Sequence, residues 1–413
     1  MSDSIVSLYP LTFVAETDGV MIGRPGTDSY AVFPEDGAEL LLRLSNGTPP
    51  ATAASWYEEK YGETVDMADF LDTLKELGFL RGVEDEPDAI PAPVRFQRLG
   101  RLVFSWPAWL CYIALCAGAI ISIVHNGSLL PTPGKIFFTR SLVLVELCII
   151  FGQLPFMLLH EGFHTLAGRR LGIPSQLGVG RRLYYLVFET TLNGLLGVPK
   201  RKRYLPFLAG MVSDLLVLST LVLIAAASRS VPGIPAIVSR FALALAFATV
   251  LRLVWQFYLF LRTDLYYVFA TALGCVNLHA ATRAHLLNRL YRLLRMNGRI
   301  IDEDQWSERD RAVARWYAPF AAAGVVALIV TGPVAVIPVM ARIVSLIGNR
   351  LSDPQGSPGD FWDTVVFLLL GVMQFGMALP VAYRDRRRAK AIRRAVAATA
   401  ASHESLQEQD SLR

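Results

Sequence analysis

Two histidines four residues apart, with a glutamate directly after the first, are the residues of this chain best suited to chemistry: His160-Glu161-Gly162-Phe163-His164. Side chains four apart on a helix lie on one face, about one turn from each other. Both imidazoles can therefore reach one Zn²⁺ at about 2.0–2.1 Å. Zinc lowers the pKa of a bound water to roughly 7 and polarises a carbonyl group, and Glu161 lies where it can accept that water's proton. The motif predicts a hydrolytic zinc site.

The surroundings of the motif strengthen this interpretation. It lies within an apolar segment near 141–168, in a chain of 413 residues of which 53% are hydrophobic. The alternative is that these polar residues only pack within a helix bundle. Ionisable residues inside a membrane span are costly and usually functional, however, and at that depth they need a partner, for which a metal ion is the obvious choice. The four cysteines form no CxxC pair, so a cysteine-ligated zinc site is not expected.

A third ligand is needed, because a catalytic zinc usually has three protein ligands and one open position. Apart from Glu161, the acidic residues in or directly after the second, third and fourth apolar segments are Glu146, Asp214 and Asp264. Asp264 follows the fourth segment on the same membrane side as the two histidines, and Asp214 lies at comparable depth in the third. Depth alone does not choose between these two aspartates. Arg252 is also intramembrane and can neutralise Asp214 or Glu146 as a buried pair.

Six apolar segments are long enough to cross a membrane, which takes about 20 helical residues. We place them near 104–124, 141–168, 205–227, 235–261, 316–340 and 361–383. Arginine and lysine are concentrated after the second, fourth and sixth segments, whereas the opposite connections hold only scattered cations: Lys135, Arg140, Arg229, Arg240, Arg342 and Arg350. Because positive charge favours the cytoplasmic side, we expect a plasma-membrane protein with both termini in the cytoplasm. A basic amphipathic helix at 279–299 is expected on the inner membrane surface.

The first 90 residues differ in kind from the rest. Short apolar runs at 11–15, 20–22 and 30–33 predict strands, and helical patterns follow at 36–46, 51–62 and 66–77. The expected fold class is mostly α, a polytopic membrane helix bundle of about six spans with a small N-terminal α+β winged-helix-like cytoplasmic domain. The expected parts are that domain at 1–90, a linker at 91–103, the membrane domain at 104–383, and a basic and then polar cytoplasmic tail at 384–413. No nucleic-acid partner is expected, because helix 66–77 carries four acidic residues against one lysine.

The membrane segments resemble the site-2 protease family of intramembrane zinc metalloproteases. His160–His164 matches the family's HExxH motif, and Gly210–Asp214 lies where the family has Gly-Pro-x-x-Asn, with Met and Asp in place of Pro and Asn. Asp264–Tyr267, followed by Leu273–Leu278, resembles the Asp-Gly-Tyr-Tyr…Leu-Gly-x-x-Asn-Leu stretch of the branch called peptide zinc metalloproteases. The Gly of that stretch is replaced by Leu265, and the Asn-Pro that usually precedes it is absent.

This resemblance covers about residues 141–280 and implies the roles of the site residues. It implies Zn²⁺ held by His160, His164 and Asp264, with Glu161 as the catalytic residue. It also implies that the 170–204 connection, which has short strand-like runs, is a hairpin whose edge an extended substrate can join as an added strand. The alternative for this connection is an ordinary surface loop.

Residues 7–83 resemble PqqD-like domains, which bind the leaders of ribosomally made, post-translationally modified peptides. Such domains take a leader as a strand added to their third strand, beside the third helix. The corresponding positions are Tyr30, Ala31, Val32, Phe33, Phe70, Leu71 and Leu74. The alternative is that most of these residues are simply core, which the alternation and the helical spacing predict equally well.

The expected function is that of an intramembrane zinc endopeptidase acting near the cytoplasmic leaflet of the lipid bilayer. Its substrate partner would be a peptide or protein, with leader removal from a modified precursor peptide as the main hypothesis. A second hypothesis is a regulatory protease that cleaves a membrane-anchored regulator. A third is a non-enzymatic membrane transport or immunity protein, which gives no reason for Glu161.

Overall fold

The computed structural model describes residues 5–373, except 17–18, 26, 28, 82–93, 183–184, 193, 232–234 and 353–356. The described chain is mostly helical, with a three-stranded antiparallel sheet near its N-terminus and a two-stranded hairpin further along. The mostly α fold class is confirmed at this level. The expected cytoplasmic tail at 384–413 lies outside the described residues.

The N-terminal unit combines a small sheet with three helices. Strands β1 (Thr12–Glu16), β2 (Gly19–Gly23) and β3 (Tyr30–Phe33) pair in that order, and helices α1 (Glu35–Ser45), α2 (Pro50–Tyr61) and α3 (Met67–Glu76) follow. These elements confirm the predicted strands and helices. Asp66 accepts hydrogen bonds from two backbone N–H groups at the start of α3, which fixes where that helix begins. Ile22, Leu41 and Leu74 are fully buried in the core between the sheet and the helices.

A hydrogen bond from Tyr57 to Asp36 ties α2 to the start of α1. It holds the pKa of Asp36 below its ordinary value and raises the pKa of Tyr57 to about 12. The Asp36 carboxylate therefore stabilises the fold at pH values above the pKa that it has in the unfolded chain. This contribution is lost as the pH falls through its lower pKa in the folded chain. The neutral Tyr57 phenol contributes stability at pH values below the pKa that it has in the unfolded chain. This contribution is lost as the pH rises through its pKa of about 12 in the folded chain. Both contributions are complete between about pH 5 and pH 9.

We expect Tyr57→Phe to lower the free energy of local unfolding of this unit by about 1 kcal/mol at pH 7, because a hydrogen bond to a partly exposed carboxylate is lost. Hydrogen exchange of the α1 and α2 amides in the full chain measures this change. The control is the same substitution in an Asp36→Asn background, where the loss should be far smaller. Equal losses in both backgrounds would contradict the role of this hydrogen bond.

Five helices are long and apolar enough to span a membrane: α5 (Trp106–His125), α6 (Leu142–Arg170), α7 (Lys200–Ser230), α8 (Ala236–Trp255) and α11 (Glu308–Ser352), the last over 308–330. They correspond to the first five predicted spans. The sixth predicted span, 361–383, is helical as far as residue 373, where the described residues end. These helices identify the chain as a membrane protein.

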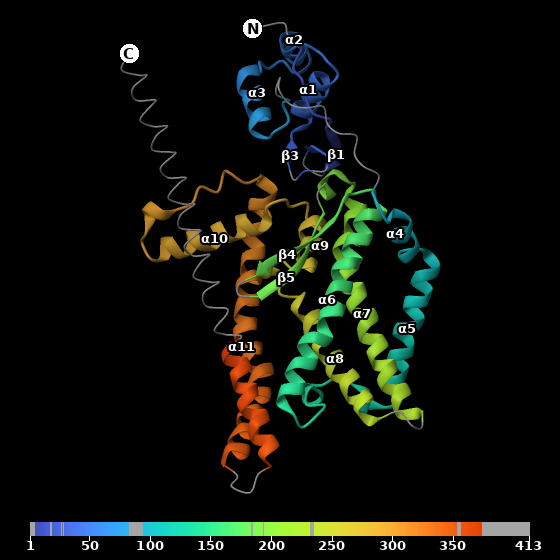
Figure 1. Ribbon diagram of the computed structural model, residues 1–413. Helices are drawn as coiled ribbons and strands as arrows, with labels where there is room; N and C mark the ends of the chain where they lie inside the picture. The colour runs from blue at the N-terminus through green and yellow to red at the C-terminus, as the bar shows by residue number, and fades with distance from the viewer. Residues whose placement is uncertain are drawn as a thin grey trace.

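Helices α7 and α8 form the centre of the bundle. Of their most apolar stretches 44% is buried, against 6% for α5 and 11% for α6. Small residues bring the helices close: Gly152 of α6 lies directly against Leu245 of α8. Figure 1 shows α6, α7 and α8 side by side, and this packing turns the polar residues of α6 and α7 toward each other.

The shorter helices lie around this centre. α4 (Gln97–Val103) occupies part of the expected linker at 91–103 and packs on α6, where Gly100 lies against the carbonyl of Leu166. Phe104, which directly follows α4, is buried against Phe163 of α6, and this contact packs the end of α4 against α6. α9 (Asp264–Ala272) and α10 (Leu278–Leu293) follow α8. α10 is shorter than the predicted 279–299 helix, because Arg295 adopts a left-handed backbone with a φ of 55°.

The N-terminal unit lies at one end of the bundle (Figure 1). Its strands β1 and β2 contact the short turn η3 (Leu195–Gly197), which follows the hairpin of β4 (Gln176–Arg182) and β5 (Tyr185–Thr191). The hairpin confirms the strand-like runs predicted between 170 and 204. Arg203, in the first turn of α7, joins the two parts. Its guanidinium lies 2.6 Å from the Glu16 carboxylate and donates to two backbone carbonyls, those of Leu196 and Val198. Because Arg203 is only 4% exposed, this ion pair is shielded from water.

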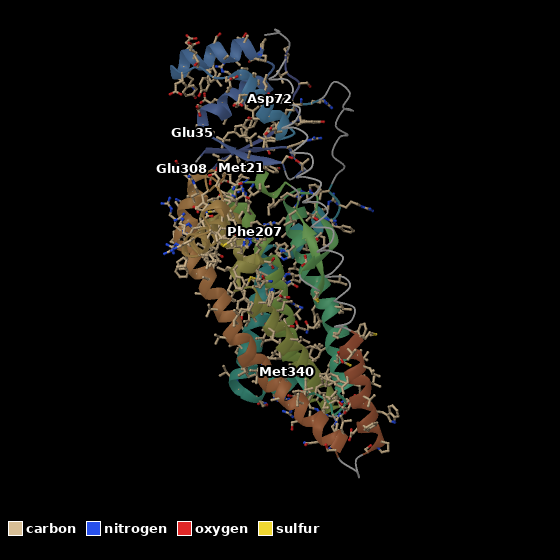
Figure 2. All side chains as sticks on the ribbon, turned by 90° about the vertical axis from the view of Figure 1, so that its left-hand side faces the viewer. Met21, Glu35, Asp72, Phe207, Glu308 and Met340 are labelled. Carbon is tan, nitrogen blue, oxygen red and sulfur yellow. The ribbon has the colours of Figure 1, made fainter. Side chains whose placement is uncertain are left out.

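A cavity of about 530 Å³ lies between the N-terminal unit and the membrane domain. Met21 and Val32 line it from the sheet, and Thr271, Cys275 and Glu308 line it from the membrane domain. Figure 2 shows Met21 close to Glu308, where the two parts meet. The cavity therefore connects the edge strand β3 with the end of α9.

Candidate metal centre

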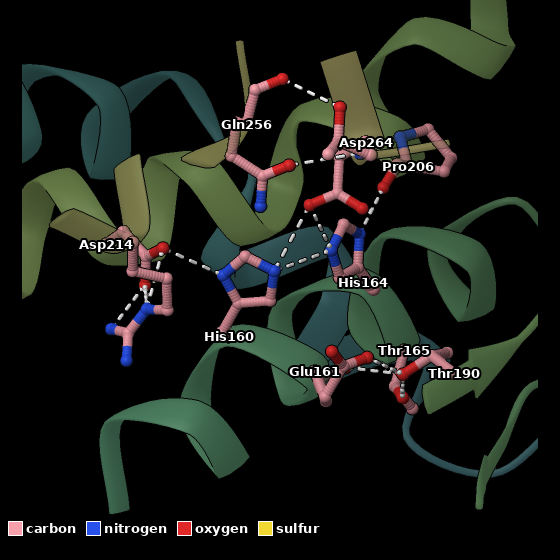
Figure 3. A network of polar contacts seen from close by, with 11 residues as sticks. His160, Glu161, His164, Thr165, Thr190, Pro206, Asp214, Gln256 and Asp264 are labelled. Atoms are coloured by element: carbon pink, nitrogen blue, oxygen red, sulfur yellow. Dashed lines mark hydrogen bonds and ion pairs between the residues drawn. The ribbon is translucent and has the colours of Figure 1, made fainter. Parts of the chain in front are cut away.

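Three polar side chains from two helices converge inside the membrane domain (Figure 3). His160 and His164 extend from α6, and Asp264 is the first residue of α9. The Nε2 atoms of the two histidines are 3.2 Å apart. Oδ2 of Asp264 lies 3.2 Å from Nε2 of His160 and 3.3 Å from Nε2 of His164. Both histidines are buried, each 7% exposed, so the structure brings together the three residues that the resemblance implies as ligands.

The other nitrogen of each ring already has a hydrogen-bond partner. Nδ1 of His164 lies 2.7 Å from the carbonyl oxygen of Pro206, and Nδ1 of His160 lies 3.0 Å from Oδ2 of Asp214. Carbonyl and carboxylate oxygens only accept hydrogen bonds, so each Nδ1 carries a proton and donates it. In the neutral rings both Nε2 lone pairs then face each other and the Asp264 carboxylate. Three electron-pair donors around one buried point favour a cation between them.

The spacing of these three atoms fits zinc. Ligand atoms about 2.0–2.1 Å from a tetrahedral metal lie about 3.3–3.4 Å from one another. The separations here are 3.2, 3.2 and 3.3 Å. Two imidazoles and one carboxylate also match a catalytic zinc site, which leaves a fourth position open. Calcium and magnesium prefer six or more oxygen ligands, which this donor set does not provide.

Asp214 lies on the opposite side of the His160 ring and is paired with Arg252. It is completely buried, and the Arg252 guanidinium contacts both of its carboxylate oxygens, the shortest distance being 2.6 Å. Arg252 also donates to the side chain of Gln153 at 3.0 Å. The pairing compensates a charge that would otherwise be isolated in the bundle. The geometry therefore separates the two aspartates: Asp264 faces the Nε2 atoms, and Asp214 orients His160 through Nδ1.

Gly210 of α7 provides the space for this arrangement. A Cβ atom at this position would overlap the Nε2 atoms of both His160 and His164. Glycine inside a helix is less stable than alanine by about 1 kcal/mol. The chain accepts this cost because the overlap excludes any side chain at position 210, where α7 comes closest to the two histidines.

The turn between α8 and α9 holds Asp264 in place. The buried side chain of Gln256 accepts a hydrogen bond from the backbone N–H of Asp264 at 3.1 Å, and the Thr263 hydroxyl donates to the carbonyl of Gln256 at 2.7 Å. Arg262 adopts a left-handed backbone with a φ of 57° within this turn. Sequence reasoning missed Gln256, because no spacing rule marks a glutamine eight residues before an aspartate.

The Glu161 carboxylate is directed toward β5 (Figure 3). The hydroxyl of Thr190 donates to Oε2 of Glu161 at 2.8 Å and lies 3.4 Å from the hydroxyl of Thr165. The hairpin thus contacts the residue expected to be catalytic. Sequence reasoning also missed Thr190, because a threonine in a strand is common and carries no signal of its own.

The residues expected to bind a peptide in the N-terminal unit fall into two groups. The larger group is packed in or against the hydrophobic core: Ala31, Phe33, Phe70, Leu71 and Leu74. The alternative interpretation, that these residues are core, holds for this group. Val32 differs, because its side chain is 39% exposed and lines the interdomain cavity. Tyr30 and Val32 lie on β3, which among the described strands pairs only with β2 and so has an open edge.

Comparison of the chain with protein-family models, with curated proteins and with solved structures gave no match. The resemblance to the site-2 protease family therefore depends on the motifs quoted above and on the geometry of this centre.

Proposed function

We propose that this chain is a membrane-embedded zinc endopeptidase of the site-2 protease type. The observation that carries the proposal is the convergence of the His160 and His164 Nε2 atoms with the Asp264 carboxylate, at the separations that a zinc ion requires. The Gly210 backbone, which leaves room at this point, supports it. The proposal also gives Glu161 a role, which a purely structural polar cluster does not.

Zinc at this centre would supply a water of lowered pKa and polarise the scissile carbonyl. The chain's own residues would prepare the site. Asp214, paired with Arg252, and the carbonyl of Pro206 hold both imidazoles with Nε2 directed inward. Glu161 would accept the proton of the attacking water, and Thr190 would hold its carboxylate between turnovers.

The cavity beside the N-terminal unit supports a peptide as the substrate. The open edge of β3 offers backbone groups to which an extended chain can pair. The cavity leads from Val32 to Thr271 near the end of α9. Asp264 is seven residues before Thr271 on the same helix, or about 10 Å at 1.5 Å per residue. About three extended residues span this distance, so one short segment could contact both the cavity and the centre.

Leader removal from a ribosomally made modified peptide is the reaction we propose for this arrangement. The N-terminal unit would hold the leader, and the membrane domain would hydrolyse the peptide bond. The arginine-rich connections favour placing this end of the bundle, with both termini, on the cytoplasmic side of the plasma membrane.

We expect Glu161→Gln to lower the rate of peptide hydrolysis about 10²–10⁴-fold while zinc stays bound, because Glu161 acts in proton transfer and is not one of the three converging groups. Cleavage of a leader-bearing precursor peptide by the purified protein in lipid vesicles, together with zinc analysis, measures both. Thr190→Val is the matched variant: it removes the hydroxyl next to Glu161 at similar volume and should lower the rate much less. Full activity of Glu161→Gln would overturn the proposed function.

A further inference from the structure

A second polar site lies at the end of the bundle opposite the N-terminal unit. α5 and α7 end there, and α6 and α8 begin there (Figure 1). In the sequence the cations of this side are spread over separate connections. The structure gathers four of them around one pocket of about 210 Å³: Arg140, Arg240, Arg342 and Arg350.

The lining of this pocket is basic and aromatic. Its other described lining residues are Phe137, Phe138, Thr139, Leu142 and Leu346, none of which is acidic. Two described carboxylates contact Arg350: Asp363 accepts a hydrogen bond from it at 3.0 Å, and Asp360 lies 3.8 Å away. Within the part of the chain that the structure describes, the other three arginines have no ion pair. Among the described residues, four guanidinium groups thus stand against two carboxylates, an excess of two positive charges.

Two of the four guanidinium groups are held in place before any ligand binds. The Arg350 side chain is only 13% exposed, and it donates to the Asp363 carboxylate and, at 2.6 Å, to the backbone carbonyl of Arg140. Since a guanidinium has five N–H donors, others remain for a ligand. Arg342 stacks on the ring of Phe137, 4.7 Å from its centroid. Fixed donors bind an anion with less loss of side-chain freedom.

We propose that this pocket binds a phosphate group. The planar fork of arginine donors matches the oxygens of a phosphate, and several arginines around one anion are the usual way to hold it. The volume of about 210 Å³ leaves room for a phosphate and a few waters at about 30 Å³ each, but it is below the roughly 300 Å³ of a typical small-molecule site.

The position of the pocket indicates where the phosphate comes from. It lies level with the ends of four membrane-spanning helices, where phospholipid headgroups are found. Phe361 and Trp362, next to Asp363, are 42% and 63% exposed, as aromatic residues at a membrane interface commonly are. The headgroup of an anionic phospholipid and free inorganic phosphate both supply the required chemistry. A direct binding experiment distinguishes these two sources.

The test compares wild type with Arg240→Gln/Arg342→Gln, both purified in neutral detergent. Each is titrated with phosphatidylglycerol, phosphatidylcholine and inorganic phosphate, and bound molecules are counted by native mass spectrometry. We expect wild type to bind one phosphatidylglycerol, more tightly than phosphatidylcholine, and the double variant to bind it at least about tenfold more weakly, since each lost charge-assisted contact is worth about tenfold or more. Displacement of this lipid by millimolar phosphate would support recognition of the phosphate group alone, and no displacement would support the lipid headgroup as the ligand.

Arg229→Gln is the matched control. Arg229 lies at the same end of the bundle, but its guanidinium donates to the hydroxyls of Ser128 and Ser239 and does not line the pocket. This variant should bind the lipid as wild type does. Because Arg240 and Arg342 are exposed, the double variant should also keep the thermal unfolding temperature of wild type. Equal lipid binding by the double variant and wild type, or binding of none of the three probes by wild type, would overturn the proposal.

Discussion

Asp264→Ala should release zinc from this protein, whereas a change at Asp214 should only weaken its binding. The Asp264 carboxylate lies 3.2 and 3.3 Å from the two Nε2 atoms, so it contacts the point where the metal would bind. Asp214 reaches only Nδ1 of His160. Removing a residue that orients a ligand commonly lowers metal affinity 10–100-fold, while removing one of three ligands leaves a site that no longer matches a catalytic zinc centre.

The variant at Asp214 must leave no buried charge unpaired. Asp214→Ala alone would isolate Arg252 within the bundle, and breaking a buried ion pair in this way commonly costs about 3–5 kcal/mol of stability. Asp214→Asn/Arg252→Gln keeps the volume and removes both charges. Loss of zinc in this double variant would then report on the His160 ring and not on unfolding.

Elemental analysis, which gives the zinc content per chain, and competition with a zinc chelator, which gives the dissociation constant, test this prediction. We expect one zinc per chain in wild type and in Glu161→Gln, and none in His164→Ala or Asp264→Ala. Asp214→Asn/Arg252→Gln should keep zinc with a 10–100-fold higher dissociation constant. Retention of zinc in Asp264→Ala, together with its loss from the Asp214 variant, would reverse the two roles. Absence of zinc from wild type would favour a non-enzymatic membrane protein.

Features set by neighbouring residues could be predicted from the sequence. The spans follow from the length of apolar runs, and the pairing of His160 with His164 follows from helical spacing. The strands and helices of the N-terminal unit follow from short alternating runs and from the Asp66 cap. Each of these depends on positions within one element, which a single sequence contains.

Features that depend on how separate helices face each other could not be predicted. Depth in the membrane leaves Asp214 and Asp264 equivalent, and only the packing of α7 and α9 against α6 places Asp214 at Nδ1 of His160 and Asp264 at the Nε2 atoms. The contact of Thr190 with Glu161 depends on how the hairpin packs against α6. The same holds for the four arginines of the second pocket, which come from three parts of the chain, Arg140, Arg240 and the pair Arg342 and Arg350 of α11, and meet only in the folded bundle.

Gly210→Ala should give a folded protein that does not bind zinc. Alanine favours a helix over glycine by about 1 kcal/mol, so α7 should not be weakened by the backbone change. Its new Cβ would overlap the Nε2 atoms of His160 and His164 and force at least one ring out of position. Because this displaces ligands directly, the zinc affinity should fall by more than the roughly 100-fold upper limit for the loss of an orienting residue.

The matched control for this prediction is Gly162→Ala, within the zinc motif itself. A Cβ at Gly162 would meet no atom within 4 Å, so this variant should bind zinc as wild type does although it lies between the two histidines. Chelator competition on both variants, with circular dichroism to confirm equal helix content, makes the comparison. If Gly210→Ala binds zinc as tightly as Gly162→Ala, the metal does not lie between the two Nε2 atoms, and the centre must be assigned to another set of groups. If only Gly210→Ala loses zinc, the absence of a side chain at position 210 is what leaves room for the metal beside the two histidines.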